Sequence, residues 1–276
     1  MLFKAMKALA RSHSITFSRD LLKLGSPEPL QGEASVAWWC GDGRPVHYRR
    51  GTSDVSLAYQ VLFKRGRRNE YWLPEGLDAK LILDIGANIG VVSRYLAYRF
   101  PHATLHCFEP IPGNYRMLER NLEGARATVH PYGLGAKSGK FKFDVPPGWQ
   151  SNPGSFSLAR SMTPSGAAVE AEVRAVGEVL PALGGAAIDL IKIDVEGAER
   201  DILDAFPDEV LARTTWIYGE LHHDLAMNPR QAFGLLERLA GWFDIEMHKR
   251  LRRRNWFFDA CNRKVSERFK NFRRLH

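Results

Sequence analysis

The sequence predicts an α/β protein built on a doubly wound, mainly parallel sheet, and three observations indicate that class. After residue 79, short apolar stretches alternate with segments of helical spacing, which is typical of strands and helices wound on both faces of a parallel sheet. The first apolar stretch leads into a glycine turn, DIGANIG, and then into a helical segment, as at the ligand-binding edge of such folds. With 45% hydrophobic and 25% charged residues over 276 positions, the composition is that of an ordinary folded protein.

Residues 1–79 are expected to form an N-terminal extension or cap. The first residues suit a short amphipathic helix, because Lys4 and Lys7 interrupt the apolar run that a signal peptide requires. Residues 35–79 hold aromatic and β-branched pieces, followed by the helical spacing of VSLAYQVLF. No apolar run reaches the roughly 18 residues of a membrane span, and the 3 cysteines include no C-x-x-C pair. We therefore expect a chain without a transmembrane segment, in a reducing cytoplasm.

Residues 80–260 carry the alternating pattern of the main domain. The first helix stops before Pro101, and the second is opened by Pro112 and closed by Gly124, the usual asymmetry of helix ends. The expected helices are VVSRYLAYRF, PGNYRMLERNLEG, GAERDILDAF and PRQAFGLLERLAGW. The expected strands are KLILDIG, TLHCFEP, ATVHPYGLG, AAIDLIKID, TTWIYGELHHD, FDIEMHK and NWFFDAC, with KFKFDV as a small added strand. Residues 146–168 are expected to form a long loop, and the last two strands an antiparallel hairpin, because no helix separates them.

Basic residues are concentrated at the C-terminal end, where residues 261–276 form a basic tail. From Lys249 onward, eleven Lys and Arg residues stand against Asp259 and Glu267, so this stretch alone outweighs the net charge of +8 of the whole chain. A solvated helix that aids solubility explains such a tail. Contact with RNA, an anionic surface or an acidic partner explains it as well.

The turn DIGANIG is the first candidate site, a cofactor-binding turn at the carboxyl end of the first strand. Gly86 and Gly90 allow the backbone to approach a ligand closely, and the amides from Asn88 onward, at the start of the helix, favour an anion. The spacing matches neither G-x-G-x-x-G nor a P-loop, so neither a dinucleotide nor a nucleoside triphosphate is indicated. Tight packing at the two glycines is the alternative explanation.

An acid at the end of the second strand completes this candidate site. Glu109, followed by Pro110, lies twenty-five residues after Asp84, about where an acidic residue binds ribose hydroxyls in dinucleotide folds. Asp84 is placed to accept a hydrogen bond from a ligand ammonium group, directly or through water. A glycine turn and a ribose acid together fit an adenosine-containing ligand without pyrophosphate. S-adenosylmethionine, which has a carboxylate, an ammonium group and a ribose, meets that description.

The stretch IKIDVEGAER forms the second candidate site. Alternate residues of a buried parallel strand share a face, so Lys192 and Asp194 are expected to point the same way, with Asp194 as a partner of the buried ammonium group. Glu196 follows in the turn, and Glu220, at the end of the next strand, is expected beside them. The cluster is therefore predicted at the carboxyl ends of two strands, at the edge of the ligand crevice.

Three roles are open to these acids. Asp194 or Glu196 can be the base that removes a proton from an acceptor hydroxyl, with Lys192 fixing its rotamer. Either acid can also simply cap the helix that follows. A divalent cation can instead acidify the hydroxyl, held by Asp194, Glu196 and Glu220 with His222 or His223 nearby. The two histidines and Trp149 are candidates for the acceptor pocket, or for ordinary packing.

From about residue 46 to about residue 260 the chain resembles the FkbM family of S-adenosylmethionine-dependent methyltransferases. DIGANIG and IKIDVEGAE together are specific to that family, and the other matching stretches are RRGTSD, EYW, HCFEPIPGNYRMLERNL, GLGAKSGKFKF, GSFSL and YGELH. The resemblance implies the seven-stranded, Rossmann-like sheet of class I methyltransferases and O-methylation of a sugar, glycan or natural-product hydroxyl. It also implies that Gly86–Gly90 is the cofactor turn, that Glu109 is the ribose acid, and that the D-x-E-G motif is Asp194, Glu196 and Gly197.

The chain departs from the family pattern at two places where an acceptor is recognised. AVGEVL, with Gly177 and Glu178, stands where the family usually shows Leu-Asp-Asp, and residues 146–168 align only at GSFSL. Two other functions stay open: an RNA methyltransferase whose basic tail binds phosphates, and a non-catalytic scaffold that binds the cofactor or merely keeps the fold. DVEG occupies the place of the N/D-P-P-Y/F turn used in base methylation, which argues against the first. The intact acids and glycines of both sites argue against the second.

Overall fold

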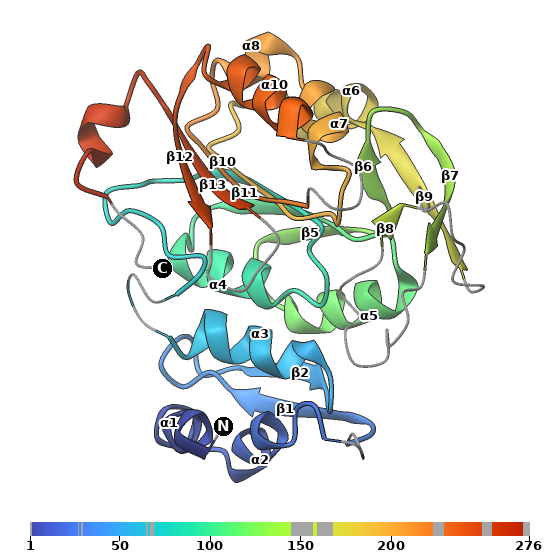
Figure 1. Cartoon of the computed structure of the whole chain (residues 1–276), viewed down its shortest axis with the longest axis vertical. Helices are drawn as coiled ribbons and strands as arrows, with labels where there is room; N and C mark the ends of the chain where they lie inside the picture. Colours follow the sequence, from blue (N-terminus) through green and yellow to red (C-terminus); the bar gives the residue numbers. More distant parts are fainter. Residues whose placement is uncertain are drawn as a thin grey trace.

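A seven-stranded sheet forms the centre of the protein (Figure 1). The computed structural model describes residues 2–26, 28, 30–64, 66, 69–144, 157–158, 168–222, 229–249 and 256–272. All seven strands run parallel except β13, which pairs antiparallel with both of its neighbours. In spatial order they are β12 (Phe243–Lys249), β13 (Trp256–Asn262), β11 (Trp216–Leu221), β10 (Leu190–Ile193), β3 (Leu81–Ile85), β4 (Thr104–Phe108) and β5 (Ala127–His130). This order confirms the predicted doubly wound sheet and its terminal hairpin.

Helices cover both faces of the sheet, and each face has its own apolar core (Figure 1). The predicted alternation is present in β10, where Leu190 packs into one core while Ile191 and Ile193 pack into the other. The first core lies under α3 (Ser53–Leu62), α4 (Val91–Arg99) and α5 (Pro112–Asn121). The second lies under α6 (Val176–Val179) with the 3-10 helix η2 (Leu180–Leu183), α7 (Glu199–Asp204), α8 (Asp208–Leu211) and α10 (Pro229–Leu239).

The N-terminal residues form two helices, a hairpin and a third helix, which pack on the side of α4 and α5 (Figure 1). Helix α3 is the one predicted from VSLAYQVLF, and the Thr52 hydroxyl caps it by accepting from the Asp54 amide. The buried carboxylate of Asp20 binds the Arg50 guanidinium at 2.8 Å and the Tyr48 hydroxyl at 3.0 Å. The other elements are α1 (Leu2–Ser12), α2 (Ile15–Leu22), β1 (Glu33–Ala37) and β2 (Pro45–Arg49).

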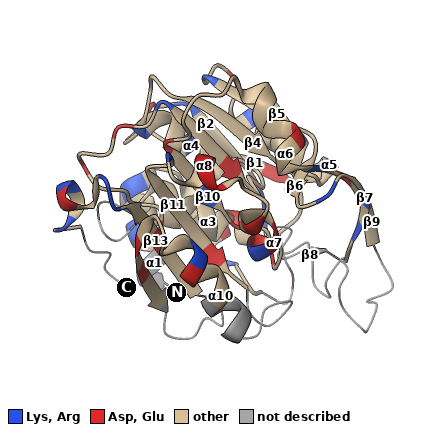
Figure 2. Cartoon of the chain, turned by 90° about the horizontal axis from the view of Figure 1, so that it is seen from above, with Lys and Arg blue, Asp and Glu red and all other residues tan. Residues whose placement is uncertain are grey.

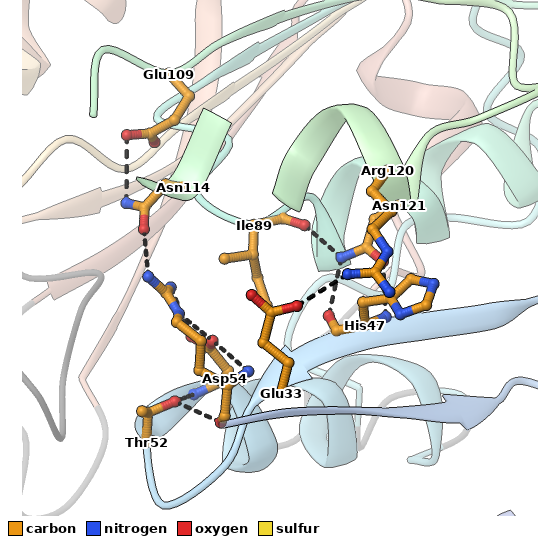
Figure 3. A network of polar contacts seen from close by, with 10 residues as sticks. Glu33, His47, Thr52, Asp54, Ile89, Glu109, Asn114, Arg120 and Asn121 are labelled. Carbon is orange, nitrogen blue, oxygen red and sulfur yellow. Dashed lines mark hydrogen bonds and ion pairs between the residues drawn. The ribbon is translucent and has the colours of Figure 1, made fainter. Parts of the chain in front are cut away.

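The side chain of Asn121 joins this N-terminal part to the central domain (Figure 3). Its Oδ1 accepts from the His47 amide at 2.7 Å, and its Nδ2 donates to the carbonyls of His47 at 3.0 Å and Ile89 at 2.7 Å. The Ile89 carbonyl belongs to the glycine turn before α4. One buried side chain therefore contacts β2, α5 and the predicted cofactor turn.

A second sheet of four strands corrects two predictions. ATVHPYGLG is not one strand, because β5 ends at His130 and β6 (Gly133–Gly135) pairs with β9 (Ala168–Ala175) instead of the central sheet. Residues 157–158, within the predicted loop, form β8 (Ser157–Leu158) on β7 (Gly139–Asp144), the predicted small strand. The sequence predicted β7 as a strand but assigned no element to β9, which pairs antiparallel with β7. The remainder of the predicted loop, including Trp149, lies outside the described residues.

The described part of the basic tail folds back onto the domain. Phe269 lies in the 3-10 helix η3 (Ser266–Phe269), and the rings of Phe269 and Phe272 pack on Trp216 with centroids 5.7 and 5.3 Å away. Both phenylalanines are buried in the core that also holds α3 and α4. Among the described residues, no helix is long and apolar enough to cross a membrane.

Candidate functional site

A cavity of about 470 Å³ opens at the carboxyl ends of β3, β4, β10 and β11. Three parts of the chain form its wall: helix α3, the loops that follow the central strands, and the four-stranded sheet. Acidic residues lie near α7 and β10, in the middle of the view in Figure 2. The polar and charged side chains of the wall are Ser53, Ser56, Gln60, Glu70, Tyr71, Asn88, Glu109, Asn114, Asp194, Glu196, Glu220 and His222.

The predicted cofactor turn contributes Gly86 and Asn88 to the wall, but not Gly90. Gly86 has a φ of +79°, and a Cβ atom there would lie 1.9 Å from the carbonyl oxygen of Asp194. Gly90 has a φ of +82°, and a Cβ atom there would lie 2.7 Å from Leu118 on α5. Both glycines thus permit close packing within the protein, which was the alternative explanation for them. At Gly86 that packing brings the two predicted motifs into contact.

The second-strand acid, Glu109, is buried at the cavity wall, beside Pro110. Its Oε2 accepts from the Asn88 amide at 2.9 Å, and its Oε1 accepts from the Ile111 amide at 2.9 Å and from the Asn114 side chain at 3.3 Å. Burial raises the pKa of Glu109, although these three donors act in the opposite direction. The carboxylate is thus fixed in orientation, and the contact with Asn88 links it to the glycine turn.

Arg49, from the RRGTSD stretch, is linked to Glu109 through Asn114. Figure 3 shows Asn114 between Glu109 and the segment that carries Asp54. Arg49 Nη1 donates to Asn114 Oδ1 at 2.8 Å, which turns the Asn114 amide group toward Glu109. Its Nε and Nη2 donate to the two carboxylate oxygens of buried Asp54 at 2.7 and 3.1 Å. Since Asp54 lies in the first turn of α3, this chain of contacts joins the α3 wall of the cavity to Glu109.

Lys192 is buried as predicted, but its direct ionic partner is Asp84 and not Asp194. Lys192 Nζ lies 3.0 Å from Asp84 Oδ1 and donates to the Gly86 carbonyl at 2.7 Å. Lys192 stands opposite Asp84 in the register of β10 and β3, which brings the two side chains together. Asp84 also accepts from the Ser93 hydroxyl at 2.6 Å. Neither Lys192 nor Asp84 lines the cavity, so both are positioned to hold the turn that does.

Burial acts to lower the pKa of Lys192, but the charges of Asp84 and Asp194 and the hydrogen bond to Asp84 outweigh it, so the pKa is raised. The ammonium group therefore stays charged. Breaking this buried ion pair is costly in free energy, because the loss of one partner leaves the charge of the other buried without compensation.

His222 lies among the predicted acids of the second site. Its Nδ1 lies 2.7 Å from Glu199 Oε1, and its Nε2 faces carboxylate oxygens of Glu196 at 3.3 Å, Glu220 at 3.7 Å and Asp194 at 3.9 Å. The sequence placed His222 only near these acids, whereas the structure places it at their centre. His223 lies outside the described residues.

Glu199 was not predicted as part of the site, although it lies in the IKIDVEGAER stretch. Its buried carboxylate accepts from the amides of Val195 at 3.2 Å and Gly197 at 3.1 Å. The backbone amides and the His222 Nδ1 all face this carboxylate, and the hydrogen bond to Glu199 raises the pKa of His222. Glu199 thereby orders the turn and fixes the orientation of the imidazole ring.

Burial acts to lower the pKa of His222, but the hydrogen bond to Glu199 and the nearby negative charges outweigh it and raise the pKa to about 10. The imidazole ring is therefore charged at neutral pH. With both nitrogens protonated, it offsets part of the repulsion between the carboxylates around it.

Two residues of the wall adopt backbone conformations that are rare for residues with a side chain. Asn88 has a φ of +51° and Glu196 a φ of +54°. Asparagine tolerates this left-handed region, but glutamate seldom adopts it. At Glu196 the conformation turns the chain sharply after β10, so that Asp194 and Glu196 both reach the cavity.

Asp194, Glu220 and His222 each offer a ligand atom within 4.8 Å of the others, which is close enough for one metal ion. Carboxylates combined with a histidine suit a transition-metal ion such as Mn²⁺ better than Mg²⁺, which prefers oxygen ligands alone. Glu196, in the predicted metal set, lies 3.3 Å from His222 Nε2. The cluster can therefore hold either a proton on His222 or a metal ion at the same place.

Replacing Gly86 by alanine is expected to reduce the free energy of unfolding by about 2–4 kcal/mol, because the added methyl group meets the Asp194 carbonyl and the positive φ disfavours a side chain. Chemical denaturation measures this change. Gly177→Ala is the control, since no atom lies within 4 Å of its Cβ position. Equal stability losses in the two variants would contradict the close contact between the motifs.

The His222 pKa gives a second prediction, for protein in EDTA. The folded-state pKa of about 10 lies above the ordinary 6.5, so the stabilisation from this group is complete below pH 6.5 and is lost as the pH rises to about 10. Urea unfolding at several pH values measures it. The stability difference between the wild type and His222→Gln should shrink steadily over that interval. A difference that does not depend on pH would refute the raised pKa.

Comparison with known proteins identifies the family. Residues 84–256 match the model of the methyltransferase FkbM domain. The chain is 30% identical over 208 residues to the AMB antimetabolite synthetase AmbE of Pseudomonas aeruginosa, covering 62% of this chain and 10% of AmbE. It is 26% identical to the 31-O-demethyl-FK506 methyltransferase FkbM of Streptomyces tacrolimicus, covering 59% of this chain and 74% of that one. It is 28% identical to the hexuronic acid methyltransferase AglP of Haloferax volcanii, covering 59% and 64%.

The chain thus spans a tenth of AmbE and just under two thirds of AglP. The matched family model nevertheless covers more than half of the chain, and it contains both predicted motifs, from Asp84 through the IKIDVEGAER stretch. The central sheet has the seven strands that the resemblance to that family implied. The chain belongs to the FkbM methyltransferase family.

Proposed function

We propose that this protein is an S-adenosylmethionine-dependent methyltransferase that acts on a hydroxyl group of a sugar, glycan or natural product. One observation carries the proposal. The cavity has a fixed carboxylate and a glycine turn on one side, and an acid–histidine cluster on the other, with the two sides joined where Gly86 touches Asp194. A methyl donor and an acceptor that meet in one cavity satisfy the alignment that an in-line displacement requires.

On the donor side, we assign Glu109 to the ribose hydroxyls. Its Oε2 accepts only one protein hydrogen bond among those of the described residues, and a carboxylate oxygen has capacity for a second. Asn88, Gly86 and Pro110 line the cavity next to it. Asp84 and Gly90 act behind the wall, where they hold the turn in shape. Bound S-adenosylmethionine would supply the electrophilic methyl group.

On the acceptor side, we assign the proton transfer to Asp194 or Glu196. The His222 ring already carries its protons at neutral pH, so it holds the carboxylates in place and does not act as the base. The side chains of Asp194 and Glu196 are 27% and 24% exposed, against 8% for Glu220, so the first two are accessible to an acceptor. Lys192 and Glu220 support them, Lys192 by fixing the turn to which Asp194 is packed.

The wall favours a polyhydroxylated acceptor. Ser53, Ser56 and Gln60 of α3 present hydroxyl and amide groups to the cavity, which suit the hydroxyls of a sugar or polyketide. Two of the relatives are named for such chemistry, a 31-O-demethyl-FK506 methyltransferase and a hexuronic acid methyltransferase. The carboxylates of the wall would repel the phosphates of RNA. The RNA alternative therefore rests on the basic tail alone.

Two variants should separate the donor and acceptor sides. Glu109→Gln is expected to weaken binding of S-adenosylhomocysteine by about 10-fold or more, because a hydrogen bond to a charged acceptor is lost. Asp194→Asn is expected to leave that affinity within a few-fold while lowering turnover by about 100-fold or more. Calorimetry gives the affinity, and transfer of a labelled methyl group to a panel of hydroxyl acceptors gives the turnover.

Asp204→Asn, at an exposed acid, is the matched control. It should change neither the affinity for S-adenosylhomocysteine nor the turnover. If the wild type gives no heat and no thermal shift with S-adenosylhomocysteine, the protein is a scaffold and the proposal fails. Label that enters RNA, and is lost at high salt, would favour the RNA methyltransferase instead.

Treatment with EDTA distinguishes the two ways in which the acid cluster can work. A carboxylate base assisted by the charged His222 predicts that EDTA leaves turnover unchanged. Loss of turnover that Mg²⁺ or Mn²⁺ restores would assign a metal ion to Asp194, Glu220 and His222. The same titration followed by calorimetry, without substrate, shows whether the ion binds to this cluster in the resting protein.

A further inference from the structure

The two N-terminal helices expose apolar side chains to an unusual degree. The described residues include six large hydrophobic side chains that are exposed, and four of them lie on α1 and α2: Met6 at 61%, Leu9 at 42%, Ile15 at 77% and Leu22 at 36%. None of the four lines the cavity. In Figure 1 the two helices lie side by side at the end of the molecule, with β1, β2 and α3 between them and the central sheet.

These side chains point outward because other residues of the same helices fill the inward face. In α1, Ala5, Ala8 and Ser12 are buried. In α2, Phe17 and Leu21 are buried. A surface helix normally turns its apolar stripe to the core and its polar residues to water. Here the large apolar residues of α1 whose side chains are described, Met6 and Leu9, are exposed, whereas the small ones are buried. This arrangement indicates a surface that meets something other than water.

The charges on the same surface are all positive. Lys7 of α1, Arg19 of α2 and Lys23, the C-cap residue of α2, are exposed. The one acid between residues 2 and 26 is Asp20, which is fully buried and paired with Arg50. We call the exposed side chains of residues 6, 7, 9, 15, 19, 22 and 23 the outer face. An apolar surface with interspersed cations and without exposed acids complements an anionic surface that has an apolar interior.

A tryptophan borders the outer face. Trp39 is 44% exposed, its ring stacks on that of His13 at 4.6 Å between centroids, and its Nε1 donates to the Arg11 carbonyl. His13 lies one helical turn after Leu9. Exposed tryptophan beside an amphipathic helix is typical of a bilayer interface, where the ring sits at the level of the headgroups.

We propose that the outer face binds the surface of an anionic phospholipid bilayer, with α1 and α2 lying in the plane of the headgroups. Binding would insert the large apolar side chains at the headgroup boundary and place the three cations beside lipid phosphates. A second copy of the chain fits the outer face less well than a bilayer does. In a symmetric dimer, Lys7, Arg19 and Lys23 of one copy would lie close to the same cations of the other copy. This surface is separate from the C-terminal tail, which also carries positive charge.

Flotation with lipid vesicles tests the proposal on the whole chain. The wild type should bind vesicles of phosphatidylcholine with about 30 mol% phosphatidylglycerol and bind pure phosphatidylcholine far less. The triple variant Lys7→Glu, Arg19→Glu, Lys23→Glu should lower the partition coefficient on the order of 100-fold, since each cation near an anionic bilayer contributes about 5-fold. Lys137→Glu, Lys140→Glu, Lys270→Glu, which changes three exposed lysines elsewhere, is the matched control and should bind nearly as well as the wild type.

A second variant tests the apolar half of the outer face. Leu9→Ser, Ile15→Ser should also lower binding about 10-fold or more, and the loss should persist at low salt because the charges are intact. Circular dichroism confirms that the fold is retained. Absence of vesicle binding by the wild type, or equal losses in the two triple variants, would overturn the proposal. The proposal would also be overturned if the wild type did not bind lipid but formed a concentration-dependent dimer, and if the Leu9→Ser, Ile15→Ser variant were monomeric.

Discussion

The buried ion pair between Lys192 and Asp84 holds together the two motifs from which the site is built. Lys192 lies on β10, and both of its contacts, the Asp84 carboxylate and the Gly86 carbonyl, belong to β3 and the turn after it. The turn is thereby drawn against the end of β10, so closely that Gly86 has no room for a side chain. Loss of either partner would leave a buried charge, at a cost of about 3–5 kcal/mol. The shape of the cavity follows from this junction.

A second buried carboxylate organises the other half of the site. Glu199 binds the backbone of the turn after β10 and the ring of His222 at the same time. The position of His222, which directly follows β11, is thereby coupled to the conformation of the turn that follows β10. Acids that would otherwise repel one another are grouped around one charged ring. The arrangement of these acids depends on the balance between their negative charges and the charged His222 ring, more than on any individual contact.

Much of the fold could be predicted because its signals are local. Alternating apolar and helical segments, the glycine turn and the ends of α5 at Pro112 and near Gly124 each reflect a few neighbouring residues. The four-stranded sheet escaped, although β9 alternates Val169, Ala171 and Val173 with charged residues. That alternation follows a long Gly- and Pro-rich stretch. The partners of β9, β6 and β7, lie more than twenty residues earlier in the chain, so no local signal gave the pairing.

The sequence predicted most of the residues that form the site, but not which of them contact one another. The sequence placed Lys192 on a buried face, yet only the register of β10 with β3 shows that Asp84 is its neighbour. His222 and Arg49 gain their positions from contacts between segments far apart in the chain, so no local signal assigned them. RRGTSD was recognisable as a motif, but its contact with Asn114 required the packed structure. The matched family model begins at residue 84, and thus leaves out both Arg49 and α3.

That boundary has a consequence for how the cavity can evolve. One wall, α3, comes from outside the family-matched residues, yet it is tied to Glu109 through Asp54, Arg49 and Asn114. A lineage that remodels this helix to accommodate a new substrate also disturbs the carboxylate at the far side of the pocket. Under the proposed assignment of Glu109 to the methyl donor, selection for a changed specificity carries a penalty in donor binding, and compensating changes should accumulate at Asp54, Arg49 and Asn114.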